Sequence, residues 1–153
     1  MNLPRLVSRQ LAAVCLAGYA QAAEPMERGE YLYKLSGCEN CHTDREHNGA
    51  RFTGGRKLGT PLGTFYTPNI TPDRQFGIGR WKRNDLVQYL ESGIRTDGDC
   101  AGSLMAEIID NGLKYAPDGD LQAVATYVAA LPAVPNQVRK LKSRKTRKTD
   151  QDY

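Results

Sequence analysis

The chain has 153 residues, of which 40% are hydrophobic and 25% charged, and its mean hydropathy is −0.56. These values suit one domain and exclude both a multi-span membrane protein and a wholly disordered chain. The formal net charge of +4 is unevenly distributed. Residues 1–22 contain two arginines and no acid, and residues 139–153 contain seven basic and two acidic residues. The remaining residues, 23–138, contain 12 basic and 15 acidic residues, so we expect no nucleic-acid partner.

The first 22 residues have the pattern of an export signal. Arg5 and Arg9 precede an apolar stretch over 11–20, and Ala20-Gln21-Ala22 matches a small-x-small cleavage site. A bilayer-spanning helix needs about 20 apolar residues, so this stretch is too short. The pattern therefore predicts a cleaved signal peptide over 1–22 and a periplasmic protein. The alternatives are an uncleaved anchor and an ordinary amphipathic helix.

A helix is predicted over 25–36, directly before a cysteine motif. Pro25 suits the first helical position, and Gly37 suits the end of a helix. The motif that follows is Cys38-Glu39-Asn40-Cys41-His42, the C-x-x-C-H pattern of c-type haem attachment. Two thiols three positions apart on a helical turn can add to the two vinyl groups of one porphyrin. The adjacent histidine then lies under the ring as an iron ligand.

Other interpretations of the two cysteines are a zinc site, a thioredoxin-type redox motif and a structural disulfide. A zinc site usually needs a second pair of ligands, and after the motif only His47 and Cys100 remain. A thioredoxin-type motif needs a βαβ context, and no strand pattern surrounds this one. The motif therefore favours a single covalently bound haem c.

The rest of the chain predicts a long loop, three helices and a tail. Residues 48–81 are rich in Gly and Pro, show no period-2 strand pattern, and are interpreted as ordered loop around a cofactor. Helices are predicted over about 84–92, from 103 or 105 to 111, and over about 119–130. The cytochrome domain is predicted to occupy 23–135. Residues 136–153 are predicted to be a basic, disordered tail.

The chain resembles class I monohaem cytochromes c, and in particular the periplasmic cytochromes that serve bacterial dehydrogenases. The resemblance covers about 24–134 and rests on four segments, 37–43, 60–73, 77–81 and 127–132. It implies an all-α cytochrome c fold, with four or so short helices wrapped around one haem. It also implies that the first and last helices cross, with Gly29 and Tyr33 against Val124 and Tyr127.

The sixth iron ligand is predicted to be Met105, the only methionine after the haem motif. Its position fits the axial methionine of the family, and a thioether ligand favours ferrous iron. A core methionine without a ligand role is the alternative. Cys100 is a remaining thiol five positions earlier. It is interpreted as inert, as a bridge to a partner chain, or as a thiolate that replaces Met105 on the iron.

Further residues of the haem pocket are predicted as well. The resemblance places Pro61 near the free ring N–H of His42 and places Tyr66 and Asn69 in the haem pocket. Arg80 and Trp81 are candidates for hydrogen bonds to a haem propionate, with a solvated Arg80 and a core Trp81 as the alternative.

These features predict a non-catalytic, outer-sphere electron carrier with His42 and Met105 as axial ligands. Its expected partners are a dehydrogenase subunit on one side and another cytochrome or a terminal oxidase on the other. The alternative is a catalytic or sensing haem subunit whose sixth site is open or held by Cys100. The basic residues of 139–148 are predicted to contact a membrane surface or an acidic patch on a partner.

Overall fold

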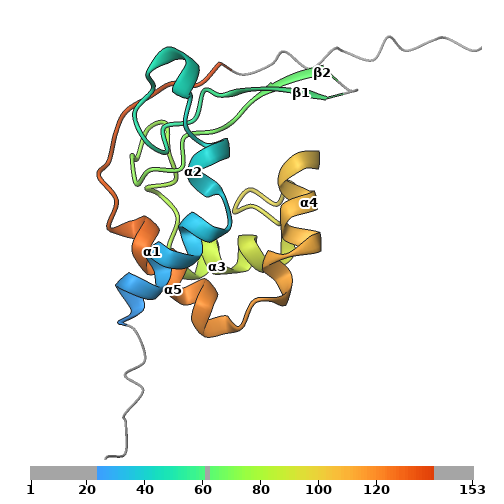
Figure 1. Ribbon diagram of the computed structural model, residues 1–153. Helices are drawn as coiled ribbons and strands as arrows, with labels where there is room; N and C mark the ends of the chain where they lie inside the picture. The colour runs from blue at the N-terminus through green and yellow to red at the C-terminus, as the bar shows by residue number, and fades with distance from the viewer. Residues whose placement is uncertain (1–23, 61–62, 140–153) are drawn as a thin grey trace, which may run out of the picture.

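The computed structural model describes residues 24–60 and 63–139, which are mostly helical with one small sheet (Figure 1). The longer helices are α1 (Pro25–Leu35), α3 (Arg83–Ser92), α4 (Ser103–Asn111) and α5 (Asp118–Ala129). A single helical turn, α2 (Cys38–Cys41), and two 3₁₀ turns, Arg45–His47 and Leu113–Tyr115, complete the helical part. None of the helices in these ranges is both long and apolar enough to cross a bilayer. The predicted signal peptide lies outside the described residues.

The predicted helices are confirmed, and their ends follow local chemistry. Pro25 occupies the first turn of α1, where its missing N–H removes no helical hydrogen bond. Gly37 separates α1 from α2 at φ 71°, and Gly93 ends α3 at φ 73°. Both are left-handed conformations that glycine adopts without strain. The predicted helix over 103–111 is α4, and the predicted helix over 119–130 is α5, shifted by one residue.

The purely α-helical fold class is corrected by a β-hairpin inside the predicted loop 48–81. Strands β1 (Lys57–Thr60) and β2 (Gly63–Tyr66) pair antiparallel, with Leu58 opposite Phe65. Each strand has four residues, with a glycine inside β1 and another at the start of β2. So short a run with glycines carries no readable apolar alternation, which is why the sequence pattern did not reveal it.

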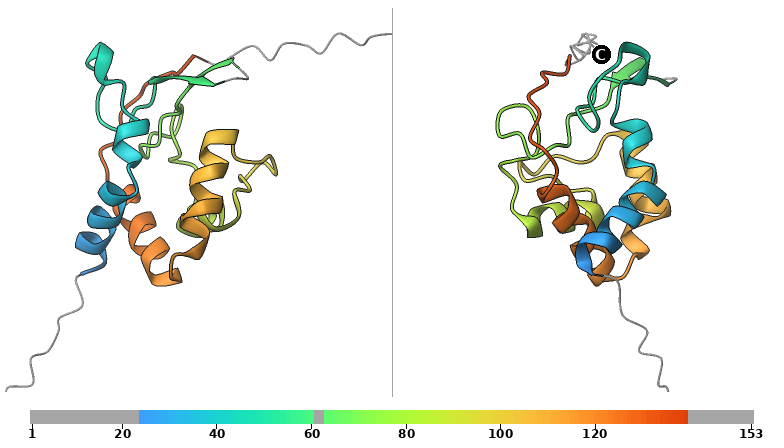
Figure 2. Two further views of the ribbon diagram at one scale, coloured as in Figure 1. Left: turned by 45° about the vertical axis from the view of Figure 1, so that its right-hand side comes forward. Right: turned by 60° about the vertical axis from the view of Figure 1, so that its left-hand side comes forward.

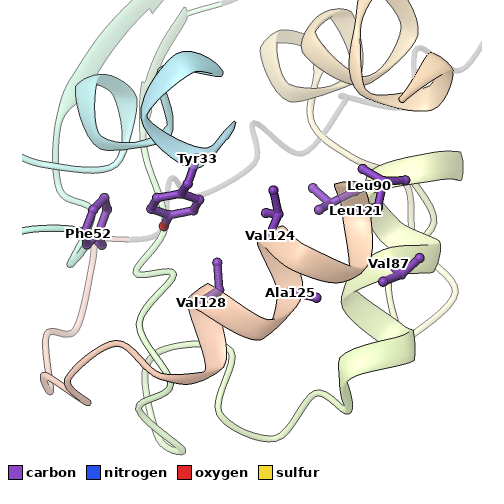
Figure 3. Packing of buried hydrophobic residues seen from close by; sticks show 8 residues of the cluster. All are labelled: Tyr33, Phe52, Val87, Leu90, Leu121, Val124, Ala125 and Val128. Atoms are coloured by element: carbon purple, nitrogen blue, oxygen red, sulfur yellow. The ribbon is translucent and has the colours of Figure 1, made fainter. Parts of the chain in front are cut away.

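The core lies where α1, α3 and α5 meet. Gly29 lets α1 approach α5 so closely that a Cβ at this position would lie 2.1 Å from the Ala123 carbonyl oxygen. The rings of Tyr33 and Tyr127 meet edge to face at 5.3 Å, and Arg28 donates two hydrogen bonds of 2.9 Å to the Asp120 carboxylate. The contact implied by the family resemblance is therefore present. Figure 3 shows the main cluster of buried side chains: Tyr33, Phe52, Val87, Leu90, Leu121, Val124, Ala125 and Val128.

After α5 the chain forms an extended segment, residues 131–139, which we call the C-terminal strap. It runs from α5 back along the loops to the hairpin (Figure 2). The Asn136 side chain donates to the Thr53 carbonyl oxygen at 2.9 Å, and the Arg139 guanidinium lies 6.0 Å from the centre of the Tyr66 ring. Residues 136–139 were assigned to a disordered tail from sequence, whereas Asn136 and Arg139 make these contacts with the body of the protein. The predicted tail beyond Arg139 lies outside the described residues.

Candidate haem site

Helix α2 places two free thiols one helical turn apart. Cys38 and Cys41 are its first and last residues, and both are half-buried. The backbone N–H of His42 closes the turn by donating to the Cys38 carbonyl oxygen at 2.9 Å. The structure therefore presents the two thiols and the histidine as one compact unit.

The His42 ring is held in a single tautomer. Its Nδ1 lies 2.9 Å from the Pro68 carbonyl oxygen, and because a carbonyl only accepts hydrogen bonds, Nδ1 carries the proton. Burial lowers the pKa of His42, against a smaller opposing effect of the Pro68 hydrogen bond. The imidazole is thus neutral at neutral pH, with the lone pair of Nε2 available to a metal.

Arginine side chains donate hydrogen bonds to Glu39 and Asn40, the two variable positions of the motif. The Glu39 carboxylate accepts hydrogen bonds from Arg51 at 2.7 Å and from Arg45 at 3.3 Å, and the Arg51 contact lowers the pKa of Glu39. Arg56 donates to the Asn40 carbonyl oxygen. The Arg51 guanidinium also lies 5.0 Å from the centre of the Phe52 ring, which belongs to the core. These contacts join α2 to the loop that follows it.

Met105 lies on α4, and in Figures 1 and 2 both α4 and α2 lie on the same side of α1 and α5. Its side chain is half-buried and packs against the core cluster. On the same helix Leu104 is 37% exposed and Ile108 is 47% exposed. Cys100 is an exposed thiol that precedes α4, and its backbone forms an isolated β-bridge with Ile94.

Two further predicted pocket residues have other partners in the structure. Asn69 is 2% exposed, and its side chain bonds to Thr71 and to the carbonyl oxygen of Val134. Tyr66 is half-buried in β2 next to Arg139. Asn69 thus joins two parts of the chain, a contact that sequence reasoning did not anticipate.

Arg80 and Trp81 are placed beside α3 and α5. The Arg80 side chain is exposed and donates to the Arg74 carbonyl oxygen at 2.8 Å. The Trp81 ring meets Tyr89 edge to face at 5.3 Å and lines a cavity with Val128. The contacts found for this pair do not join it to α2 or α4, so propionate binding stays a prediction.

Pro61, predicted near His42, lies outside the described residues. The acceptor of the His42 ring N–H is the carbonyl of Pro68, in the Thr67-Pro68-Asn69 part of the segment that carried the resemblance. The segment that contains the acceptor was therefore identifiable from the sequence. Identifying the Pro68 carbonyl as the acceptor needed the loop conformation, and the position of Pro61 stays a prediction.

The structure does not favour the other interpretations of the two cysteines. Burial raises the pKa of the Cys38 thiol to about 12, whereas a redox-active C-x-x-C thiol needs a lowered pKa. Within 24–60 and 63–139, no three His, Cys, Asp or Glu side chains are grouped closely enough to hold a metal ion by themselves. Neither finding supports a zinc site or a redox-active thiol at Cys38.

The donor set fits haem c. Two thiols stand one turn apart, a neutral imidazole with a free Nε2 follows them, and α4 offers a thioether beside partly exposed apolar side chains. These are the groups that hold a c-type haem, which needs covalent attachment, two axial ligands and an apolar cover.

No protein-family model matches the chain, but individual curated proteins do. It is 41% identical over 107 residues to the fructose dehydrogenase cytochrome subunit of Gluconobacter japonicus, covering 69% of this chain and 22% of that protein. It is 43% identical over 84 residues to the cytochrome c subunit of the quinone alcohol dehydrogenase of Gluconobacter oxydans, covering 54% and 17%. The chain is homologous to bacterial cytochrome c subunits.

A third relative is described as a diheme protein. The chain is 38% identical over 111 residues to a diheme cytochrome c-type protein of Cereibacter sphaeroides, covering 71% of this chain and 36% of that protein. This chain spans between 17% and 36% of the length of these three relatives. The homology supports a cytochrome c family, a covalently bound haem c and electron transfer in general.

Proposed function

We propose that this chain is a periplasmic class I cytochrome c with one haem, attached through Cys38 and Cys41 and ligated by His42 and Met105. It accepts single electrons from a dehydrogenase and passes them to the respiratory chain. The observation that carries the proposal is the Cys38–His42 unit with its ring N–H bonded to Pro68, which presents the free Nε2 that an iron ligand needs.

The chain's own residues define what the site does. A bound haem c supplies an iron that alternates between the ferrous and ferric states. Cys38 and Cys41 make its attachment permanent, and His42 is kept neutral and oriented by burial and by Pro68. Together with His42, the Met105 sulfur would hold the iron, and two protein ligands would leave no place for oxygen or a substrate. Such a site transfers electrons and catalyses no bond chemistry.

The sixth position is tested by spectroscopy of the unmutated protein. Because Met105 occupies it, the ferric protein is expected to show the weak methionine-to-iron band at the red end of the spectrum. The ferrous protein is expected not to bind carbon monoxide. Ready binding of carbon monoxide would contradict electron transfer as the function. It would favour the alternative, a catalytic or sensing subunit with an open or Cys100-held sixth site.

The basic tail supplies a second test, of partner binding. Residues 140–148 add six lysines and arginines to Arg139, and we propose that they contact a negatively charged surface on a redox partner or a membrane. Truncation after Arg139 is expected to slow reduction by the dehydrogenase that co-purifies with the protein, by about tenfold at low ionic strength. The difference should vanish at high salt, where these charges are screened. Equal rates for both forms at low salt would contradict the role of the tail.

A further inference from the structure

The side chain of Asn69 is a buried polar junction between the loop and the C-terminal strap. Its Nδ2 donates to the Val134 carbonyl oxygen at 2.8 Å. Its Oδ1 accepts from the backbone N–H of Thr71 at 2.9 Å and from the Thr71 hydroxyl at 2.8 Å. Asn69 is 2% exposed and Thr71 is 1% exposed. A buried amide with three hydrogen bonds holds its backbone in one position.

The Thr71 hydroxyl completes the junction from the other side. While donating to Asn69, it also accepts from the backbone N–H of Val134 at 3.3 Å. The strap is thus bonded to the loop through both the N–H and the carbonyl of Val134. Two hydrogen bonds at one residue hold an extended segment more firmly than a single surface contact would. The strap therefore helps to hold the loop in place.

The junction lies next to the group that orients His42. The Pro68 carbonyl, which accepts the His42 Nδ1–H at 2.9 Å, belongs to the peptide unit between Pro68 and Asn69. Turning that carbonyl away from His42 requires the backbone of Asn69 to turn as well. On its other side the peptide is packed against Gly54, where a Cβ would lie 2.4 Å from the Pro68 carbonyl carbon. The carbonyl is therefore held between Gly54 and the Asn69 junction.

We infer that Asn69 and Thr71, anchored to Val134 of the strap, are positioning residues that set the strength of the His42–Pro68 hydrogen bond. The inference rests on the proposed role of His42 as an iron ligand. A firm Nδ1–H···O bond increases the electron-donating strength of the imidazole and so favours ferric iron. Loosening the junction weakens this bond, which raises the reduction potential. The strap thereby contributes to the redox properties of a histidine almost a hundred residues away in sequence.

The test compares two substitutions at one position in the haem-loaded protein. Thr71→Val removes the hydroxyl with almost no change of shape, and Thr71→Ser keeps it. For Thr71→Val we expect the His42 Nδ1–H, observed by NMR in the ferrous protein, to exchange with solvent about tenfold faster. We also expect the ferrous-to-ferric ratio at fixed ambient potential to rise about threefold, which is about 28 mV at about 59 mV per tenfold change. Thr71→Ser is expected to keep both properties.

A core variant separates positioning from general destabilisation. Val128→Ala, in α5, lowers the stability of the folded protein without removing any hydrogen bond among Asn69, Thr71 and Val134. It is expected to leave the potential and the exchange of the His42 ring proton unchanged. Asn69→Leu, which removes all three side-chain bonds, is expected to exceed Thr71→Val in both readouts. If Asn69→Leu does not fold, the comparison of Thr71→Val with Thr71→Ser still tests the positioning role.

Two failures are distinguishable. Attached haem with the same potential and ring-proton exchange in Thr71→Val as in Thr71→Ser overturns the positioning role and leaves the proposed function intact. An unmutated protein in which haem does not attach, or in which His42 is not a ligand, overturns the proposed function itself.

Discussion

Replacing both Cys38 and Cys41 with alanine is expected to abolish covalent attachment of haem. The two thiols are one turn apart on α2, and each is expected to form one thioether bond to the same porphyrin. Without them only coordination by axial ligands remains, and the haem is lost on denaturation. The measurement is peroxidase staining of haem on a denaturing gel, together with the alkaline pyridine spectrum. Each single variant should retain one thioether and shift the pyridine spectrum toward that of free haem.

Cys100→Ser is the matched control for this experiment. Cys100 is the third free thiol in the described part of the chain, and it is exposed and lies outside α2. Its removal is expected to leave covalent haem at the level of the unmutated protein. Covalent haem in the variant that lacks both Cys38 and Cys41 would contradict the assignment of the attachment site.

The helices were predictable because their signals are local. Pro25 at the start of α1 and Gly37 and Gly93 at the ends of α1 and α3 act through the backbone of their own neighbourhood. The apolar faces of α3 and α5 repeat with helical spacing, and they supply Val87, Leu90, Leu121, Val124 and Val128 of the core. The C-x-x-C-H motif is equally local, which is why the candidate haem site was found without the fold.

The loop and the strap were not predictable because their contacts join residues far apart in sequence. Asn69 and Val134 are 65 positions apart, and Thr53 and Asn136 are 83 positions apart. Neither the hydrophobic periodicity nor the composition of the sequence indicates that two such distant residues are hydrogen-bonded. The sequence predicts a tail from residue 136 because no apolar periodicity follows Pro135, and it gives no sign that the Asn136 side chain bonds to the Thr53 carbonyl oxygen.

The acceptor of the His42 ring N–H illustrates the same limit within the site. Pro61 and Pro68 both lie in the segment that carried the family resemblance, and either one can offer a carbonyl to a histidine ring. The position of Pro68 depends on the hairpin, since β2 pairs with β1 and leads directly into Thr67. Thr67 then bonds to Arg56 and Gly55 through its backbone, and this places Pro68 against His42. Without the hairpin, the sequence could not identify the Pro68 carbonyl as the acceptor, and the position of Pro61 stays a prediction.

Replacing Met105 with alanine is expected to open the sixth coordination position. A thioether stabilises ferrous iron, and the identity of the axial ligands sets haem potentials over a range of about 0.8 V, so the potential should fall by on the order of 0.1 V. The ferrous variant should now bind carbon monoxide, which needs an exchangeable position. The weak methionine-to-iron band of the ferric protein should disappear. Because Met105 also packs against the core, a modest loss of thermal stability is expected as well.

Met26→Ala and Cys100→Ser decide between the possible ligands. Met26 is 41% exposed on α1, before the haem motif, and its replacement is expected to leave the spectrum, the potential and the lack of carbon monoxide binding unchanged. Cys100 lies five residues before Met105, close enough along the chain to compete for the same position. A spectrum that is unchanged in Met105→Ala but altered in Cys100→Ser would assign the sixth position to the thiolate. A thiolate favours ferric iron more strongly than a thioether, so the protein would then have a low potential unsuited to accepting electrons from a dehydrogenase.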